Sequence, residues 1–486
     1  MIAAVLAPLV LWIFTGDFLM AESLFVLLAA WHFLKPDEGP PVLATALSFQ
    51  WLQVALGVFY VFFTKRPLEA TLDSDYEPMV RIGLGCIIAL AVGLYLGCYL
   101  VKRSGKTAHA KVAEVVGQQM ALTVPQLLIV YAVSISTVGV LQRFGQDYPT
   151  IRQGLVSLTY VRLGLLYLLL RRFVLGSRWD LVGGLLGVEI VLGLTGFYAG
   201  FREPLILTAL AVLEIFDRRR MRHWVALGAI TLGAVVLGTM WVSIRTDYRD
   251  RVANDDSFAE NRNQRVDMIK ASASQWASQD KDALAEDMDK LVDRLWAIYY
   301  PALAVARVPS VIPHTDGRLM METLQHVFAP RVFFPDKPDL KSDSEMVRKY
   351  AGVHVAGDEE GTTIAFGYAA ESYIDYGAPL MFLPVFIYGL LMGLVYQGIM
   401  RTFKYRDMAI AVATTISYLS LYQFERSWSK TAGLAGTLLV YVGSMAYLLD
   451  RLWYQRFGPV DASTRPEPAP SLPGPPQRPA AFSHSK

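Results

Sequence analysis

The sequence has very few cysteines and few charged residues for its length. Only Cys86 and Cys98 occur among 486 residues. They lie in one apolar segment, roughly 18 Å apart along a helix, which is too far for a disulfide. Charged residues make up 18% of the chain and hydrophobic residues 53%, whereas soluble domains carry about a quarter charged residues. This excludes a disulfide scaffold and a cysteine-based metal site, and it favours a membrane protein.

Motifs for nucleotide and metal chemistry are also missing. The sequence contains no Walker loop, no G-x-G-x-x-G opening a helix, and no H-E-x-x-H or paired Cys/His zinc spacing. The seven histidines are scattered, and the acidic run at 358–360 is typical of a solvated charge cluster. We therefore expect no metal, no cofactor and no nucleic-acid partner.

Twelve apolar segments, bounded by charges or by Pro and Gly, are long enough or nearly long enough to cross a bilayer. Met1 is followed by neither a basic region nor a small-residue cleavage site, so we expect the first segment to be a membrane helix and not a cleaved leader. The predicted spans are 2–15, 18–34, 42–63, 79–101, 120–141, 151–170, 180–199, 204–216, 224–243, 379–400, 408–424 and 431–449.

Basic residues are concentrated in alternate loops between these segments. By the positive-inside rule the basic loops are cytoplasmic, which also places both termini in the cytoplasm. The membrane domain is then made of residues 1–243 and 379–450, and the Pro-rich residues 451–486 form a disordered cytoplasmic tail. The basic loops contain Lys102, Arg103, Lys106, Lys111, Arg171, Arg172, Arg178, Arg218, Arg219, Arg220, Arg222, Arg401, Lys404 and Arg406.

The long segment 244–378 lies on the opposite, extracytoplasmic side. Apolar residues at helical spacing predict two amphipathic helices in it, around 266–276 and 284–299. Their apolar faces must be buried, most simply against the membrane domain. The predicted fold is an all-α polytopic membrane protein with about 12 transmembrane helices and one large outer loop.

Three features on the outer side could carry chemistry, and the first is the hairpin Gly200-Phe201-Arg202-Glu203-Pro204. The Arg202 guanidinium is fixed at the membrane boundary, where it is suited to bidentate binding of phosphate oxygens. The alternative is an arginine that reaches to lipid headgroups.

The second feature is the sequence FAPRVFFPDKP at 328–338. Its three prolines stiffen the backbone, and Arg331 and Lys337 lie beside aromatic side chains that can enter the membrane interface. This combination suits a lipid-linked anion. The alternative is an interfacial anchor that only clamps the loop.

The third feature is GYAAESYIDYG at 367–377, which leads into the next span. At i and i+4 of a helix, Glu371 and Asp375 would lie on one face. They could act as a base for a sugar hydroxyl beside the Tyr373 ring, or they could simply be acidic residues that favour the helix N-terminus.

In this order, GFREP, a large outer loop, PRVFFPDKP and GYAAESYIDYG resemble the bacterial oligosaccharide repeat-unit polymerases (Wzy type) that make O-antigen and exopolysaccharide. The resemblance covers the topology throughout and the sequence best from about Leu194 to Tyr396. It implies a GT-C-like glycosyltransferase of the bacterial inner membrane, with the large loop in the periplasm. The enzyme would transfer a growing chain from undecaprenyl diphosphate to a new lipid-linked repeat unit and release polyprenyl diphosphate.

Such a reaction needs cations for the leaving diphosphate and a base for the acceptor hydroxyl. We expect Glu371 to be the general base, with Asp375 as the alternative. The expected diphosphate and sugar ligands are Arg202, Arg331 and Lys337, helped by Arg245 or Arg249, together with Arg318, Arg348 and Tyr373.

Three other functions remain open. A ligase that moves a finished glycan from the same carrier to another acceptor would share this chemistry. A lipid-linked oligosaccharide flippase or other transporter would be expected to have two similar halves, which the sequence lacks; its intramembrane charges are Arg162, Glu189 and Glu214, which look isolated. A membrane scaffold is the last option. The expected partners are the lipid-linked oligosaccharide and the bilayer, with room for a chain-length regulator and a flippase.

Overall fold

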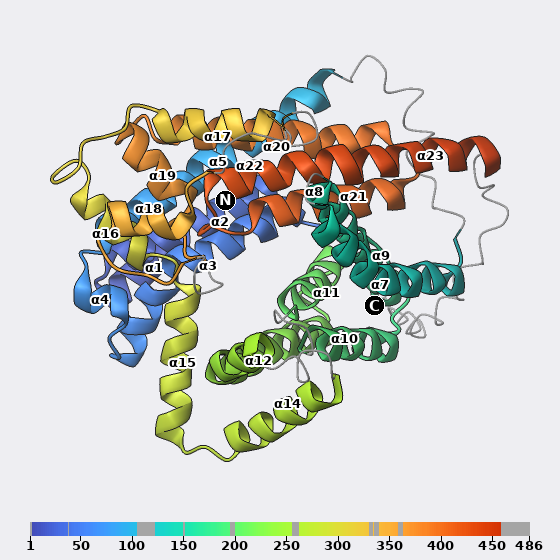
Figure 1. Cartoon of the computed structure of the whole chain (residues 1–486), viewed down its shortest axis with the longest axis horizontal. Helices are drawn as coiled ribbons and strands as arrows, with labels where there is room; N and C mark the ends of the chain where they lie inside the picture. The colour runs from blue at the N-terminus through green and yellow to red at the C-terminus, as the bar shows by residue number, and fades with distance from the viewer. Residues whose placement is uncertain are drawn as a thin grey trace, which may run out of the picture.

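A computed structural model describes residues 2–36, 38–104, 122–148, 151–194, 200–254, 262–329, 334, 340–357 and 363–457. All regular elements in these ranges are helices (Figure 1). The predicted all-helical fold class is therefore confirmed. Each of the twelve apolar segments contains a helix, although some predicted ends are not helical, for example residues 422–424.

The helices that precede the predicted loop differ in length from 5 to 34 residues. They are α1 (Ile2–Thr15), α2 (Phe18–Leu34), α3 (Val42–Thr64), α4 (Glu69–Asp73), α5 (Glu77–Ser104), α7 (Val124–Asp147), α8 (Arg152–Thr159), α9 (Val161–Leu175), α10 (Trp179–Leu194), α11 (Arg202–Glu214) and α12 (Met221–Asn254).

The loop and the last part of the chain are helical as well. The loop contains α14 (Arg262–Ala277), α15 (Lys281–Leu295), α16 (Tyr299–Arg307), α17 (Arg318–Phe328), α18 (Asp343–Tyr350) and α19 (Gly367–Tyr376). After it come α20 (Phe382–Thr402), α21 (Arg406–Leu421), α22 (Trp428–Thr437), the π-helix η2 (Leu438–Gly443) and α23 (Ser444–Phe457).

Two predicted domain boundaries fall inside helices. The boundary at 243/244 lies within α12, which continues to Asn254, and the boundary at 450/451 lies within α23, which continues to Phe457. The prediction of a disordered tail from residue 451 was therefore wrong for its first residues, where the helix runs on beyond the apolar stretch. Residues 458–486 lie outside the described part of the chain.

Within the part of the chain that the structure describes, seven helices are long and apolar enough to cross a membrane. They are Val42–Thr64, Glu77–Ser104, Val124–Gly145, Arg152–Leu175, Met221–Arg245, Phe382–Thr402 and Trp428–Arg456. Their outer faces expose large apolar side chains; on α20, Leu383, Ile387 and Leu391 follow one another at intervals of four residues. Water-soluble monomers rarely expose such continuous apolar surface, so these helices are those of a membrane protein.

Helices α5 and α20 pack most closely, through glycines at matching positions (Gly93 and Gly97 on α5, Gly389 and Gly393 on α20). A Cβ atom on Gly389 would lie 2.5 Å from the Leu90 carbonyl oxygen. Small residues spaced four apart allow the two backbones to approach in this way.

The charges within the apolar segments are paired with one another. Arg162 contacts the buried Glu189 at 2.5 Å, and Tyr131 also donates to that carboxylate. Arg171 binds Glu214 at 2.8 Å. Arg162 and Glu189, which look isolated in the sequence, are thus mutual partners, and Glu214 is paired with Arg171 from a predicted cytoplasmic loop, as buried charges must be.

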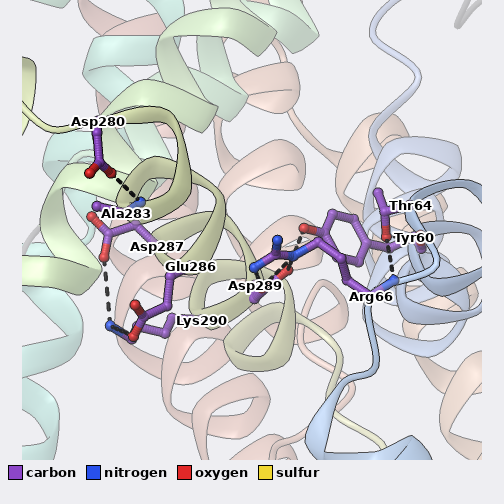
Figure 2. A network of polar contacts seen from close by, with 9 residues as sticks. All are labelled: Tyr60, Thr64, Arg66, Asp280, Ala283, Glu286, Asp287, Asp289 and Lys290. Carbon is purple, nitrogen blue, oxygen red and sulfur yellow. Dashed lines mark hydrogen bonds and ion pairs between the residues drawn. The ribbon is translucent and has the colours of Figure 1, made fainter.

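The loop is attached to the membrane domain through α15, which corresponds to the predicted amphipathic helix 284–299 (Figure 2). Asp289 on α15 accepts hydrogen bonds from Arg66 Nε at 2.7 Å and from Tyr60 Oη at 2.6 Å. Just beyond α15, the Trp296 indole donates to the Val54 carbonyl at 2.8 Å and lies against Gly57. The C-terminal half of α3 therefore holds the loop in place.

We predict opposite effects for two substitutions on α20. Gly389→Ala should lower the stability by about 1–3 kcal/mol, because the methyl group meets the backbone of α5. Gly398→Ala, where no atom lies within 4 Å of the added Cβ, should be neutral or raise stability by roughly 0.5–1 kcal/mol, since Gly weakens helices. Thermal unfolding in detergent measures both. Equal changes in unfolding temperature for the two variants would contradict the close packing of α5 against Gly389.

Candidate functional site

Helix α21 ends at Leu421 and α22 begins at Trp428, and the residues between them (422–427, here called the helix break) form no regular helix. Two buried glutamines on α3 bind its backbone. Gln53 Nε2 donates to the Tyr422 carbonyl at 2.8 Å, and Gln53 Oε1 accepts from Phe424 N at 3.0 Å. Gln50 Nε2 donates to the Leu421 carbonyl. Because buried backbone groups need partners, α3 determines where the helix break lies.

Helix α19, the last helix of the loop, holds the helix break from another direction. Tyr368 N donates to the Arg426 carbonyl at 2.9 Å, and Tyr368 Oη donates to Gln50 Oε1 at 2.7 Å. Gly367 approaches so closely, with φ of +85°, that a Cβ atom there would lie 2.5 Å from the Phe424 carbonyl oxygen. The loop and the membrane domain therefore meet at this segment.

Two arginines flank the Tyr422 ring. The Arg202 guanidinium lies 5.0 Å from the ring centroid, and the Arg426 guanidinium lies 5.7 Å from it. Arg202 Nη2 also donates to Tyr422 Oη at 2.7 Å and contacts Glu203 Oε1 at 3.3 Å. Arg426 Nη1 donates to the Leu419 carbonyl at 2.9 Å. The structure thus places the predicted Arg202 beside a second cation from the helix break.

Arg202 is the first residue of α11, so it lies at the positive end of that helix, in the same turn as the Glu203 carboxylate. A helix N-terminus and a guanidinium both favour an anion. The Arg202 side chain is 38% exposed, which leaves N–H donors accessible to a ligand. This end of α11 is chemically suited to bind phosphate oxygens.

Glu371 lies on α19 and faces the N-terminus of α22. Its Oε2 accepts a hydrogen bond from Trp428 N at 2.7 Å. Burial raises the pKa of Glu371 to about 8; the bond from Trp428 and the charge of Lys430 act against this shift, whereas the Asp343 and Asp375 carboxylates add to it. A carboxyl group with a pKa near neutral is suited to proton transfer.

Asp375 has different partners from Glu371. Its carboxylate accepts from Leu319 N at 3.0 Å, from Met320 N at 2.7 Å and from the Thr315 hydroxyl. It therefore caps the N-terminus of α17, which is a structural role. The interpretation of Asp375 as an alternative base gains nothing from these contacts, and Glu371 remains the candidate.

The other predicted residues are not gathered at the helix break by the contacts described. Arg318 pairs with Glu322 on α17 at 3.9 Å, and Arg348 Nη2 donates to the Val355 carbonyl at 2.7 Å. Tyr373 packs edge-on against His314, with ring centroids 5.6 Å apart. Arg245 lies on α12 and is half-buried.

Arg331 and Lys337, with the prolines around them, lie outside the described residues, and so does the acidic run 358–360. Arg249 belongs to α12, but its side chain is also outside the described part. Among the described residues, no three His, Cys, Asp or Glu side chains lie close enough to hold a metal ion.

Several residues of the site were missed by the sequence reasoning. Arg426 and Lys430 lie between the predicted spans 408–424 and 431–449 and were not named as site candidates, and Tyr422 lies within the first of these spans. Gln50 and Gln53 were detectable, because two amides three residues apart are unusual within an apolar segment. Asp343 gave no signal; in the structure it pairs with Lys430 at 2.7 Å.

We predict that Glu371 makes stability depend on pH. The folded-state pKa of about 8 lies above the ordinary value of 4.5, so the unfolded chain loses this proton first and wild-type stability falls as pH rises from 4.5 to 8. Glu371→Gln cannot titrate. The unfolding temperature of the variant, measured relative to wild type, should therefore increase with pH over this range. A constant difference would contradict a raised pKa.

Comparison with known proteins gives a family but no activity. No curated protein and no solved structure matches the chain. A family model matches residues 98–427, a range that extends from the end of α5 to the helix break and includes Arg202, Glu371 and Arg426. This is more than half of the chain, and the protein therefore belongs to the family described as a domain of unknown function (DUF8712).

Proposed function

We propose that the protein is a membrane glycosyltransferase that polymerises undecaprenyl-diphosphate-linked oligosaccharide repeat units into O-antigen or exopolysaccharide. The observation that carries the proposal is the helix break, where Arg202 and Arg426 flank Tyr422 and a carboxyl group of raised pKa, Glu371, binds the adjoining helix N-terminus. Transfer from a diphosphate to a hydroxyl requires cations for the leaving group and a base for the acceptor, and both are attached to the helix break or to the helix that follows it.

The proposed topology has twelve spans in the inner membrane of a bacterium. Seven of these spans are the long apolar helices. The other five are shorter helices: α1, α2, α10, α11 and α21. Both termini would be cytoplasmic, and the loop 244–378 would be periplasmic. The helix break and the N-terminus of α11 would then lie at the periplasmic surface, where the diphosphate of a lipid-linked donor is found.

Arg202 and Arg426 would bind the diphosphate of the donor. As the bond between the sugar C1 and the diphosphate oxygen breaks, negative charge develops on the leaving group. Guanidinium groups held in fixed positions stabilise that charge without reorganising. Arg331 and Lys337 remain candidates for the same role, on the resemblance of their segment to the polymerase motif.

Glu371 would accept the proton of the acceptor. The acceptor oxygen forms a new bond to C1 of the growing chain, its proton passes to Glu371 Oε1, and polyprenyl diphosphate leaves. Trp428 N would keep Oε2 in place during this step, through the 2.7 Å hydrogen bond seen in the free protein. Lys430, paired with Asp343 at 2.7 Å, would add positive charge nearby.

A ligase would use the same site with another acceptor, so its product and not its geometry separates it from a polymerase. Loss of a polymerase leaves single repeat units attached, whereas loss of a ligase leaves long polymer unattached. A transporter is less favoured, because Arg162 and Glu189 neutralise each other at 2.5 Å.

The decisive experiment gives the purified protein a defined lipid-linked repeat unit, without nucleotide, and looks for a ladder of products. We expect Arg202→Ala, Arg426→Ala, Arg331→Ala and Glu371→Gln to lower the rate on the order of 10²-fold or more, at unchanged abundance in the membrane. The matched control is Arg178→Ala, an exposed arginine paired with Asp180, which should keep full activity. Normal chain lengths from all four variants would refute the site.

The rate of polymerisation should depend on pH in a way that identifies the base. Because the pKa of Glu371 is about 8, most of the free enzyme holds this proton at neutral pH, and a base must be unprotonated to act. We therefore expect the rate at low substrate concentration to rise with pH and to level off above pH 8. A pH-independent rate would exclude Glu371 as the base while leaving the arginine site in place.

A further inference from the structure

Helix α17 exposes a row of large apolar side chains. Leu319 and Thr323 face inward and are buried, whereas Met321, Leu324 and Phe328 are 56%, 38% and 79% exposed. At spacings of three and four residues the last three form one stripe along the helix. A helix whose outer face is in contact with water would have polar residues at these positions.

The helix lies alongside a candidate membrane span. It contacts α22 and α19, and Figure 1 shows α17, in yellow, running beside α22, in red-orange. Helix α22 begins the apolar helix Trp428–Arg456, one of the seven that are long enough to cross a membrane. Helix α17 therefore packs beside a helix that is apolar and long enough to cross a membrane.

The orientation of α17 is fixed at its N-terminus. Asp375 accepts from Leu319 N and Met320 N, Thr315 N donates to the Ile374 carbonyl at 3.1 Å, and Gly317 lies against the Tyr376 ring. These contacts satisfy backbone donors that could not remain unbonded in a hydrocarbon environment. They also prevent the helix from rotating to bury its stripe.

The exposed side of α17 has a polar edge beside the apolar stripe. Arg318 and Glu322 lie on that edge, 57% and 50% exposed, and pair with each other at 3.9 Å. With 11 residues, α17 is about 16 Å long, roughly half of a 30 Å hydrocarbon core. It is too short to cross a bilayer but long enough to enter one.

We infer that α17 is a half-inserted helix, whose stripe of Met321, Leu324 and Phe328 contacts the acyl chains of the outer leaflet beside α22. Exposed apolar rows on the spans themselves have the same character; on α20, Leu383 and Leu391 are 56% and 53% exposed. Hydrocarbon is therefore the occupant that this stripe shares with the exposed faces of the spans. The predicted loop 244–378 is then partly a membrane element, and this holds whatever reaction the protein catalyses.

The test uses the full chain in phosphatidylcholine–phosphatidylglycerol vesicles, with a spin label on Met321→Cys, Leu324→Cys or Phe328→Cys. Collisions with oxygen, which concentrates in lipid, should exceed those with a water-soluble nickel chelate several-fold at these three positions. Glu322→Cys on the polar edge of the same helix is the matched control. At that position, collisions with the nickel chelate should exceed those with oxygen. Wild-type protein treated with the same spin label gives the background signal from Cys86 and Cys98, which is subtracted.

Two outcomes of the spin-label experiment would overturn the inference. Nickel accessibility at all three positions would mean that the stripe faces water, and protection from both reagents would mean that protein covers it. A second measurement needs no substitution: a phospholipid with a diazirine in its acyl chain should crosslink to the 318–328 peptide of the wild-type protein. Labelling of the long spans without labelling of this peptide would also overturn it.

Discussion

Polar backbone groups in apolar surroundings must be hydrogen-bonded, and this constraint governs the structure around residues 422–427. Here the chain leaves one helix and enters another without its helical bonds. Gln50 and Gln53 replace them from α3. An unbonded buried carbonyl costs about 1–3 kcal/mol, so the helix break can lie only where these two amides reach it. The positions of Tyr422 and Arg426 are thus set by a helix some 370 residues earlier in the sequence.

Helix α19 shows how two carboxylates of one helix acquire different properties. Asp375 receives three hydrogen bonds at the start of α17, whereas Glu371 receives one at the start of α22. A single donor does not offset the burial of Glu371, and the neighbouring Asp343 carboxylate adds repulsion, so its pKa is raised to about 8. Asp375 is thus the capping residue of α17, and Glu371 remains the residue proposed for proton transfer.

The helices were predictable because length and apolar composition are local properties of the sequence. The site was less so. The i, i+4 rule placed Glu371 and Asp375 on one face, but it could not foresee that α22 and α17 would supply separate partners. Arg348 is predicted to bind substrate, and in the structure it donates to the Val355 carbonyl; a cation that serves a backbone group looks the same in sequence as one that serves a ligand. Gln50 and Gln53 could be noticed as polar, but their partners depend on tertiary packing.

The arginines of the membrane domain fall into two groups, and the difference argues for where an anion binds. Arg162 and Arg171 each contact a glutamate at 2.5–2.8 Å, so these charges are neutralised within the protein. At the helix break, Arg426 donates to a neutral carbonyl, and Arg202 donates to the Tyr422 hydroxyl more closely than it contacts Glu203. A cation solvated by neutral groups keeps its attraction for an external anion. Arg202 and Arg426 on either side of Tyr422 are therefore the pair of cations to which we assign the diphosphate.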